Sequence, residues 1–296
     1  MRGKRALPAL ALMLLLLALS APGSASAPTS FATEVSPMPW SVDQPVLKVP
    51  PSRFKYLGRT WDHPTWVATQ GLHLVASYTM TGDLAYLSLA IRDAEHLLAR
   101  STTEDGAVWF GFTFPWNHGD DTVLQAPWYS ALTQGDALAL FSRLATTTHD
   151  PRWRSAADAT FASFLAPRRA GHPWVADTDE DGYLWLEEYP SDGPIDRILN
   201  GHMMAAFAIW EYWRATGSLK AVELLTAAAE AVKHYGPLFR VQGEVSFYGL
   251  RFKAQHGQYH LAHIAELHTL AQITGDSFFD WLADAFASDT PWLMGH

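Results

Sequence analysis

The chain has 296 residues, a formal net charge of −9 and no cysteine. Without cysteine it forms no disulfides, so its stability must come from a hydrophobic core, and cysteine-based metal sites and thiol catalysis are excluded. Nucleic-acid-binding domains are normally basic, so the acidic balance argues against a nucleic-acid partner.

The first 27 residues have the pattern of a secretory signal peptide. Arg2, Lys4 and Arg5 form a basic start, residues 6–19 are apolar, and residues 25–27 read A-S-A, which matches a cleavage site. The apolar run is shorter than the ~20 residues of a membrane span, although an uncleaved signal anchor is an alternative. We expect a secreted or periplasmic protein with no stable membrane insertion after signal removal.

Residues 28–52 are rich in proline and serine and are expected to form an extended, partly disordered arm. From Thr65 onward, apolar residues recur at the three- and four-residue spacing of helices. A helix is expected to end at Gly82, which suits a C-cap, and Asp83 can cap the next helix. The 13% aromatic content fits a helical core, and exposed rings could stack on sugars.

This two-helix unit occurs four times, and its turns begin at Thr81, Thr148, Thr216 and Thr274, which are 67, 68 and 58 residues apart. Recurrence of a helical hairpin predicts a solenoid or a closed toroid, in which each unit buries its apolar face against its neighbours. We therefore expect residues 53–296 to form one all-α domain.

Three long connections, 101–125, 168–196 and 236–258, each follow the second helix of a hairpin. In a toroid of hairpins they lie on one rim, and loops of about 20 residues in a compact domain are usually functional or disordered. Alternating residues at 108–112, 183–186 and 245–250 predict short strands, which we expect to pair as β-hairpins.

The residues that could carry chemistry lie in or directly after these connections. Glu187 and Glu188 could be a glycosidase pair, but adjacent residues seldom achieve the carboxylate separation of ~5 Å or more that such a pair needs. His260 and His263 could bind a metal, yet more often such histidines hydrogen-bond in a polar cleft. The acidic turn 177–181 lacks the glycine and distal glutamate of an EF-hand. We expect no metal and no cofactor.

Five segments in order resemble the C-terminal catalytic domain of D-glucuronyl C5-epimerases. They are PWYSALTQG at 127–135, WLEEYP at 185–190, ILNG at 198–201, FYGLR at 247–251 and YHLAHI at 259–264. The family pattern reads approximately PWYSAMGQG, W-x-E-E-Y-P, VLNG, Y-D-L-R-H and D-Y-H-x-x-H. The resemblance runs from about residue 53 to the C-terminus. It implies an (α/α) toroid, which the repeat indicates independently, with the β-hairpins in its rim loops.

The resemblance implies a polysaccharide epimerase, an isomerase that converts D-glucuronate to L-iduronate in a heparosan-like polymer. One group removes the C5 proton and another returns a proton from the opposite face, while donors stabilise the charge on the adjacent carboxylate. By motif position, Glu188 and Tyr259 would be the acid/base pair, and Tyr189 and Tyr248 would tune or relay protons. A phenol suits this role when its neighbours lower its pKa.

The resemblance also implies that Arg251 clamps the uronate carboxylate with its planar guanidinium. The further candidates for contact with the sugar chain are Asn200, His260, Gln134, Trp128, Tyr129 and Glu187. The sequence departs from the family at Phe252 and Gln258, where the family has a histidine and an acid. These departures leave the substrate length and sulfation preference open.

The expected partner is an acidic, glucuronate-containing polysaccharide, and a homodimer is an option. The animal enzymes carry β-rich domains ahead of this one, and this chain has none, so we expect the substrate groove and dimer contacts to differ. Two other functions fit the same residues. A uronate polysaccharide lyase would share the proton abstraction and then eliminate the C4 substituent, and a glycan-binding protein would use the scaffold without catalysis.

Overall fold

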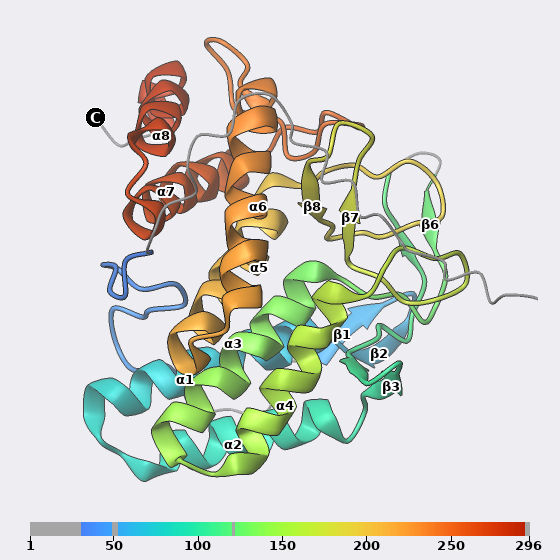
Figure 1. The fold of residues 1–296 in the computed structure, drawn as a ribbon, viewed down its shortest axis with the longest axis vertical. Helices are drawn as coiled ribbons and strands as arrows, with labels where there is room; N and C mark the ends of the chain where they lie inside the picture. Colours follow the sequence, from blue (N-terminus) through green and yellow to red (C-terminus); the bar gives the residue numbers. More distant parts are fainter. Residues whose placement is uncertain (1–30, 49–52, 120–121, 294–296) are drawn as a thin grey trace, which may run out of the picture.

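The computed structural model describes residues 31–48, 53–119 and 122–293. The predicted signal peptide and the first residues of the arm lie outside these ranges. Within them, no helix is both long and apolar enough to cross a membrane. Four helical hairpins make up most of the fold (Figure 1): α1 (Pro64–Thr81) with α2 (Leu84–Leu98), α3 (Ala131–Thr148) with α4 (Pro151–Phe161), α5 (Leu199–Thr216) with α6 (Leu219–Tyr235), and α7 (Gly257–Thr274) with α8 (Ser277–Asp289).

The four hairpin turns share one construction, which confirms the repeat seen in the sequence. In the first, Gly82 adopts a left-handed conformation with φ of 69° and ends α1. The Asp83 N–H donates to Thr81 Oγ1 over 3.2 Å, and the Asp83 side chain caps α2 by accepting from Ala85 N. The same threonine contact recurs at Thr148, Thr216 and Thr274. The periodic threonine therefore stabilises each turn by accepting a backbone N–H.

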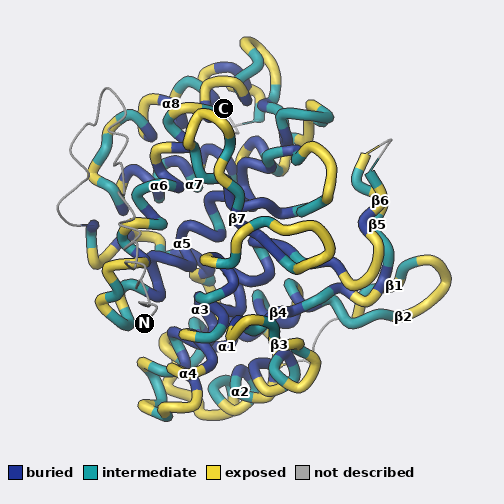
Figure 2. The backbone as a smooth tube through the Cα atoms, turned by 45° about the vertical axis from the view of Figure 1, so that its right-hand side comes forward, coloured by how far each residue is buried: buried dark blue, intermediate teal, exposed yellow. Residues whose placement is uncertain are grey.

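The first helices of the hairpins form an inner layer, in which α3 packs against α1 and α5, and α5 packs against α7. Residues are buried on most sides of α3 and α5, so both helices run through the buried centre of the molecule in Figure 2. The second helices cover this layer and bury one face each. At Gly135 a Cβ atom would lie 3.0 Å from the Ala205 backbone, so the glycine allows the close approach of α3 and α5.

Four two-stranded antiparallel hairpins lie together on one side of the helices (Figure 1). They are β1 (Arg53–Tyr56) with β2 (Arg59–Asp62), β3 (Thr102–Glu104) with β4 (Ala107–Trp109), β5 (Trp116–Asn117) with β6 (Val123–Leu124), and β7 (Ala176–Thr178) with β8 (Leu184–Leu186). Short 3₁₀ helices follow α4, α6 and α8, at η1 (Ala162–Leu165), η2 (Gly236–Phe239) and η3 (Pro291–Leu293). The predicted combination of helical hairpins and short β-hairpins is confirmed.

The strand predicted at 245–250 is wrong. This segment makes only isolated bridges, between Phe247 and Gln255 and between Gly249 and Ile198. Its backbone turns to reach several partners, because Tyr248 N donates to Ala254 O, whereas Leu250 N donates to Asp196 O. Alternating apolar residues therefore mark a buried irregular connection here.

The part of the N-terminal arm that is described has no regular secondary structure but packs on the helices. Phe31, Val35 and Trp40 are buried in the main core. Trp40 Nε1 donates to Asp136 Oδ1 over 3.0 Å. These contacts attach the arm to the inner layer, which the proline- and serine-rich composition did not predict.

Candidate active site

A pocket of about 190 Å³ lies at the N-terminal ends of the inner helices. Three helices supply residues from their first turns, such as Thr65 of α1, Leu132 of α3 and Tyr259 of α7. The 168–196 connection contributes Glu188 and Tyr189. The aromatic lining consists of His63, Trp66, Phe112, Phe114, Trp116 and Trp128. The pocket thus combines an acid and two phenols with planar walls suited to a sugar ring.

Three of the four residues proposed for proton transfer line this pocket, and the fourth, Tyr248, contacts all three. Tyr248 donates from its hydroxyl to Glu188 Oε1 over 3.3 Å, and the hydroxyls of Tyr248 and Tyr189 are also 3.3 Å apart. The rings of Tyr248 and Tyr259 pack with centroids 4.4 Å apart. Segments about 60 residues apart in the chain therefore form one connected polar cluster.

Glu188 is buried against α5, directly beside Gly201. A Cβ atom at Gly201 would lie 2.3 Å from Glu188 Oε2, so only glycine leaves room for this carboxyl. Among the described residues, Oε2 has no hydrogen-bond partner. Burial raises the pKa of Glu188 to about 7. The group can therefore accept and release a proton at neutral pH.

The tyrosines differ from the expectation that neighbours lower a phenol pKa. Burial, followed by the negative charge of Glu188, raises the pKa of Tyr189 and Tyr248 well above the ordinary value. The same two causes raise the pKa of Tyr259. All three phenols are therefore protonated at neutral pH and suit donation of a proton, whereas Glu188 suits its removal.

Glu187 does not line the pocket, and it organises the backbone. It is fully buried, and its two oxygens accept from the backbone N–H groups of Tyr189 at 3.0 Å and Arg197 at 3.3 Å. Burial raises its pKa to about 8. Glu187 thus stabilises the turn that presents Glu188 and Tyr189, and it lines neither the pocket nor the groove described below.

Three further candidates lie in the protein interior. Gln134 accepts from Phe110 N and donates to Val108 O, so it holds the segment around β4 to α3. His260 accepts from Ser246 N over 2.8 Å, while its Nε2 lies 2.8 Å from Thr290 Oγ1. Asn200 is buried on α5 and lines neither the pocket nor the groove described below. The structure does not bring these three to the cluster.

The histidine pair considered as a metal site is also structural. His263 Nδ1 lies 2.9 Å from Ser246 Oγ, and burial lowers the pKa of His263 to about 3. Within the described residues, no three His, Asp or Glu side chains are grouped so that they could hold a metal ion.

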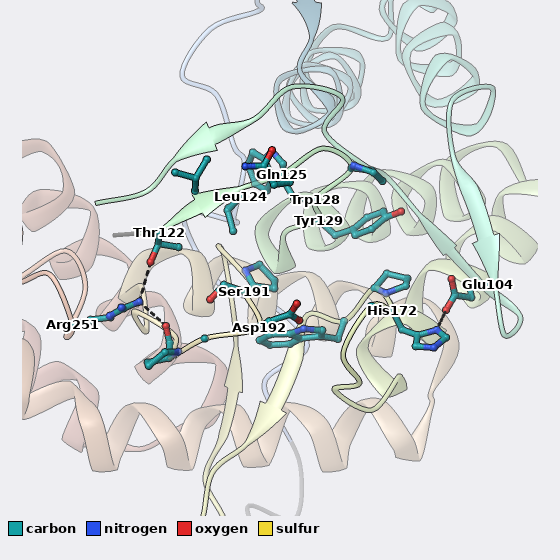
Figure 3. A pocket seen from close by; sticks show the side chains of 18 residues that line it. Glu104, Thr122, Leu124, Gln125, Trp128, Tyr129, His172, Ser191, Asp192 and Arg251 are labelled. Atoms are coloured by element: carbon teal, nitrogen blue, oxygen red, sulfur yellow. Dashed lines mark hydrogen bonds and ion pairs between the residues drawn. The ribbon is translucent and has the colours of Figure 1, made fainter. Parts of the chain in front are cut away.

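A groove of about 740 Å³ adjoins the pocket, and Trp128 lines both. Figure 3 shows Trp128 and Tyr129 on one wall and Ser191 and Asp192 on the facing wall. Arg251 lies at one end of the groove, and its Nη1 donates to Thr122 Oγ1 and to Pro194 O over 3.0 and 2.8 Å. The three long connections therefore converge here, as predicted, and Arg251 lines the groove and not the pocket.

Several site residues were not predicted from the sequence. His63 caps α1 and stacks on Trp66 with centroids 4.6 Å apart, and burial lowers the pKa of His63 to about 4, so it is neutral. His118 stacks on Tyr189 from the 101–125 connection. Glu266 lies seven residues after Tyr259 on α7, and burial and the charge of Glu188 raise its pKa well above the ordinary value. The dense aromatic residues at 108–116 were the signal in the sequence that could have identified the aromatic lining of the pocket.

Comparison with known proteins places these residues in a family. A family model described as the D-glucuronyl C5-epimerase C-terminus matches residues 104–288, well over half of the chain. The match includes Glu188, Tyr189, Tyr248 and Tyr259.

Solved structures of low sequence identity share the fold. Cellobiose 2-epimerase from Bacillus thermoamylovorans B4167 superposes with a TM-score of 0.57 at 12% identity, over 78% of this chain and 60% of that one. An unsaturated glucuronyl hydrolase specific for heparin gives 0.53 at 13% identity, over 76% and 61%. A GH76 α-mannanase from Bacteroides thetaiotaomicron gives 0.51 at 13% identity, over 75% and 55%. The chain thus spans 55–61% of these proteins' lengths.

Proposed function

Because the chain belongs to the family described by the D-glucuronyl C5-epimerase C-terminal domain, we propose that it inverts C5 of glucuronate residues within a polysaccharide. The observation that carries this proposal is the connected cluster of Glu188, Tyr248 and Tyr189, with Tyr259 packed on Tyr248. Inversion of a C–H centre requires one group that takes a proton and another that gives one. The cluster provides one group able to take a proton and three able to give one.

In the proposed reaction, the Glu188 carboxylate takes the C5 proton from one face of the sugar. The electron pair left on C5 delocalises into the uronate carboxylate. Tyr259 then donates its phenolic proton to C5 from the opposite face, which gives L-iduronate. The cluster returns to its starting state when Glu188 loses its proton and Tyr259 regains one from water.

The charge that develops on the uronate carboxylate needs hydrogen-bond donors directed at it. Tyr189 and Tyr248 remain protonated because burial and the Glu188 charge raise their pKa values. Tyr189 lines the pocket and can therefore donate a hydrogen bond to the carboxylate, while Tyr248 donates to Glu188. Arg251 lines the adjoining groove, so we assign it to the carboxylate of a neighbouring uronate and not to the reacting one.

The proposed substrate is a heparosan-like polymer of glucuronate. Supporting this, a groove of about 740 Å³ adjoins the pocket, and Trp128 lines both. We also propose that the hairpins are arranged as an (α/α) toroid with these connections at its mouth, and that the protein is exported. The similar folds of three carbohydrate-active proteins support the toroid, and residues 1–27 support export.

The test is incubation with heparosan in D₂O, followed by mass spectrometry, NMR and ultraviolet absorbance. Epimerisation predicts deuterium at C5 and new L-iduronate signals with no change in chain length. Growth of unsaturated-uronate absorbance with chain scission would instead identify a lyase. Binding of the polymer with neither change would leave only a glycan-binding protein.

A further inference from the structure

The ring of His118 lies flat against Tyr189. The two ring centroids are 4.0 Å apart and the planes differ by 19°. His118 Nε2 lies 3.0 Å from Asp196 Oδ2, and the two side chains are 12% and 3% exposed. Phe252 packs edge-on against the imidazole, with centroids 5.4 Å apart. The histidine is therefore held between a buried carboxylate and two aromatic rings.

Asp196 is itself fixed by the connection that carries Arg251. Its Oδ1 accepts from the backbone N–H groups of Arg251 at 2.7 Å and Phe252 at 3.1 Å. Its backbone carbonyl accepts from Leu250 N at 2.8 Å. A Cβ atom at Gly249 would lie 2.4 Å from Asp196 Cγ, so the glycine is needed for this approach. One carboxylate therefore joins all three rim connections.

Tyr189 is held from three directions. Its backbone N–H donates to Glu187, its hydroxyl lies 3.3 Å from the Tyr248 hydroxyl, and one face of its ring is covered by His118. The hydrogen bond to Tyr248 fixes the end of the ring but not the plane of the ring. The stacked imidazole supplies a constraint on the plane, beside a tilted contact with Trp128 at a centroid distance of 6.1 Å.

We propose that His118, held by Asp196, is a positioning residue that keeps the Tyr189 ring and hydroxyl in register with the Tyr248–Glu188 pair. The proposal rests on the proposed function, since it explains how one donor of that cluster is aligned. A positional error of about 1 Å in a catalytic group can cost about 100-fold in rate. His118 does not line the pocket, so its effect is expected on turnover and not on substrate binding.

The test compares His118→Ala with His118→Phe in the C5 exchange assay. His118→Phe keeps a flat ring over Tyr189 but loses the bond to Asp196. We expect kcat to fall at least about 10-fold in His118→Ala, with KM within about twofold of the wild type, and to recover partly in His118→Phe. Unchanged kcat in His118→Ala, or a rise in KM alone, would overturn the proposal.

The chain offers a matched control in a second histidine–tyrosine stack. His234 lies on Tyr183 with centroids 3.9 Å apart and planes 14° apart, away from the pocket. His234→Ala removes the same type of contact and is expected to leave kcat and KM unchanged. A similar loss of kcat in both variants would show a general effect of removing a stacked ring and would overturn the specific role of His118.

A second readout does not need activity. Tetranitromethane nitrates the phenolate form of tyrosine, so the nitration rate of each residue, followed by peptide mass spectrometry, reports both the cover of its ring and its ionisation. His118→Ala is expected to speed nitration of Tyr189 severalfold and leave Tyr183 unchanged, and His234→Ala is expected to do the reverse. An unchanged Tyr189 rate would overturn the positioning role. If the wild type exchanges no C5 hydrogen but the nitration pattern holds, the proposed function fails and the positioning contact stands.

Discussion

At the scale of residues, the two adjacent glutamates have different partners and different roles. Glu188 faces Tyr248 and the pocket, whereas Glu187 accepts two backbone N–H groups beneath the turn. The sequence could rank Glu188 as the acid/base through its motif position. It could not assign Glu187, because the direction of each side chain depends on the tertiary course of residues 187–197.

Replacing Glu188 with glutamine tests the proposed base. The amide has nearly the same volume but cannot take a proton, so C5 exchange is expected to fall by at least about 100-fold. Because Glu188 Oε2 has no partner among the described residues, the melting temperature is expected to stay within a few degrees of the wild type. Exchange that persists in Glu188→Gln would remove this residue from the base role.

Glu187 should instead show its effect in the pH dependence of stability. Burial raises its folded-state pKa from 4.5 to about 8, so the folded state binds the proton more tightly than the unfolded chain does. Its contribution to the free energy of unfolding is therefore fully present below pH 4.5 and is lost as the pH rises through about 8.

Glu187→Gln is expected to flatten this decline in denaturant unfolding measured between pH 4.5 and pH 8. Glu180→Gln, at an exposed position in the neighbouring turn, serves as the control and should retain the wild-type slope. Equal slopes in all three proteins would contradict a buried, protonated Glu187.

At the scale of elements, the hairpin turns were predictable because their signals are local. The threonine, the left-handed residue and the N-cap all lie within three positions of each other. The irregular path of 245–250 was not predictable, because its backbone groups bond to distant partners. Asp196 belongs to another connection, and Ala254 lies at the far end of a turn. The contact between His118 and Asp196 was not predictable for the same reason, since these residues are 78 positions apart in the chain.

The start of α5 gives an element-level prediction. Gly201→Ala would push a methyl group into Glu188, because its Cβ would lie 2.3 Å from Oε2. We expect a destabilisation of about 1–3 kcal/mol and near-complete loss of C5 exchange as Glu188 is displaced. In Gly257→Ala, at the start of α7, the new methyl group would meet only ordinary contacts, the shortest 3.7 Å. This variant should retain both the stability and the C5 exchange of the wild type. Full activity in Gly201→Ala would show that Glu188 need not occupy this position.

At the scale of the whole molecule, four helical hairpins bring three rim connections to one groove and one pocket. The repeat in the sequence predicted this convergence. Which residues line the groove and which line the pocket depends on side-chain packing, and the sequence did not predict it. Arg251 illustrates the difference. Its motif position implied a clamp on the reacting sugar, yet its guanidinium bonds to Thr122 and Pro194 in the groove wall.

A groove role for Arg251 predicts a dependence on substrate length. Arg251→Ala is expected to raise KM for a heparosan octasaccharide by about 10-fold with a smaller change in kcat, because it removes one charged hydrogen bond of about 1.5–3 kcal/mol. For a trisaccharide, which has no neighbouring uronate for Arg251 to bind, KM should barely change. The comparison is made by steady-state C5 exchange. Equal effects on both substrates, or a loss confined to kcat, would place Arg251 at the reacting sugar.

In the proposed mechanism two different groups, Glu188 and Tyr259, act on opposite faces of C5. This mechanism is tested most directly by a single turnover in D₂O, with enzyme in excess over a heparosan oligosaccharide and NMR detection of the product. Tyr259 lines the pocket, and its hydroxyl proton exchanges for deuterium in D₂O. Because Tyr259 donates this deuteron, the L-iduronate formed is predicted to carry deuterium at C5. L-iduronate that retains the substrate's own hydrogen at C5, or the absence of any L-iduronate, would contradict the account.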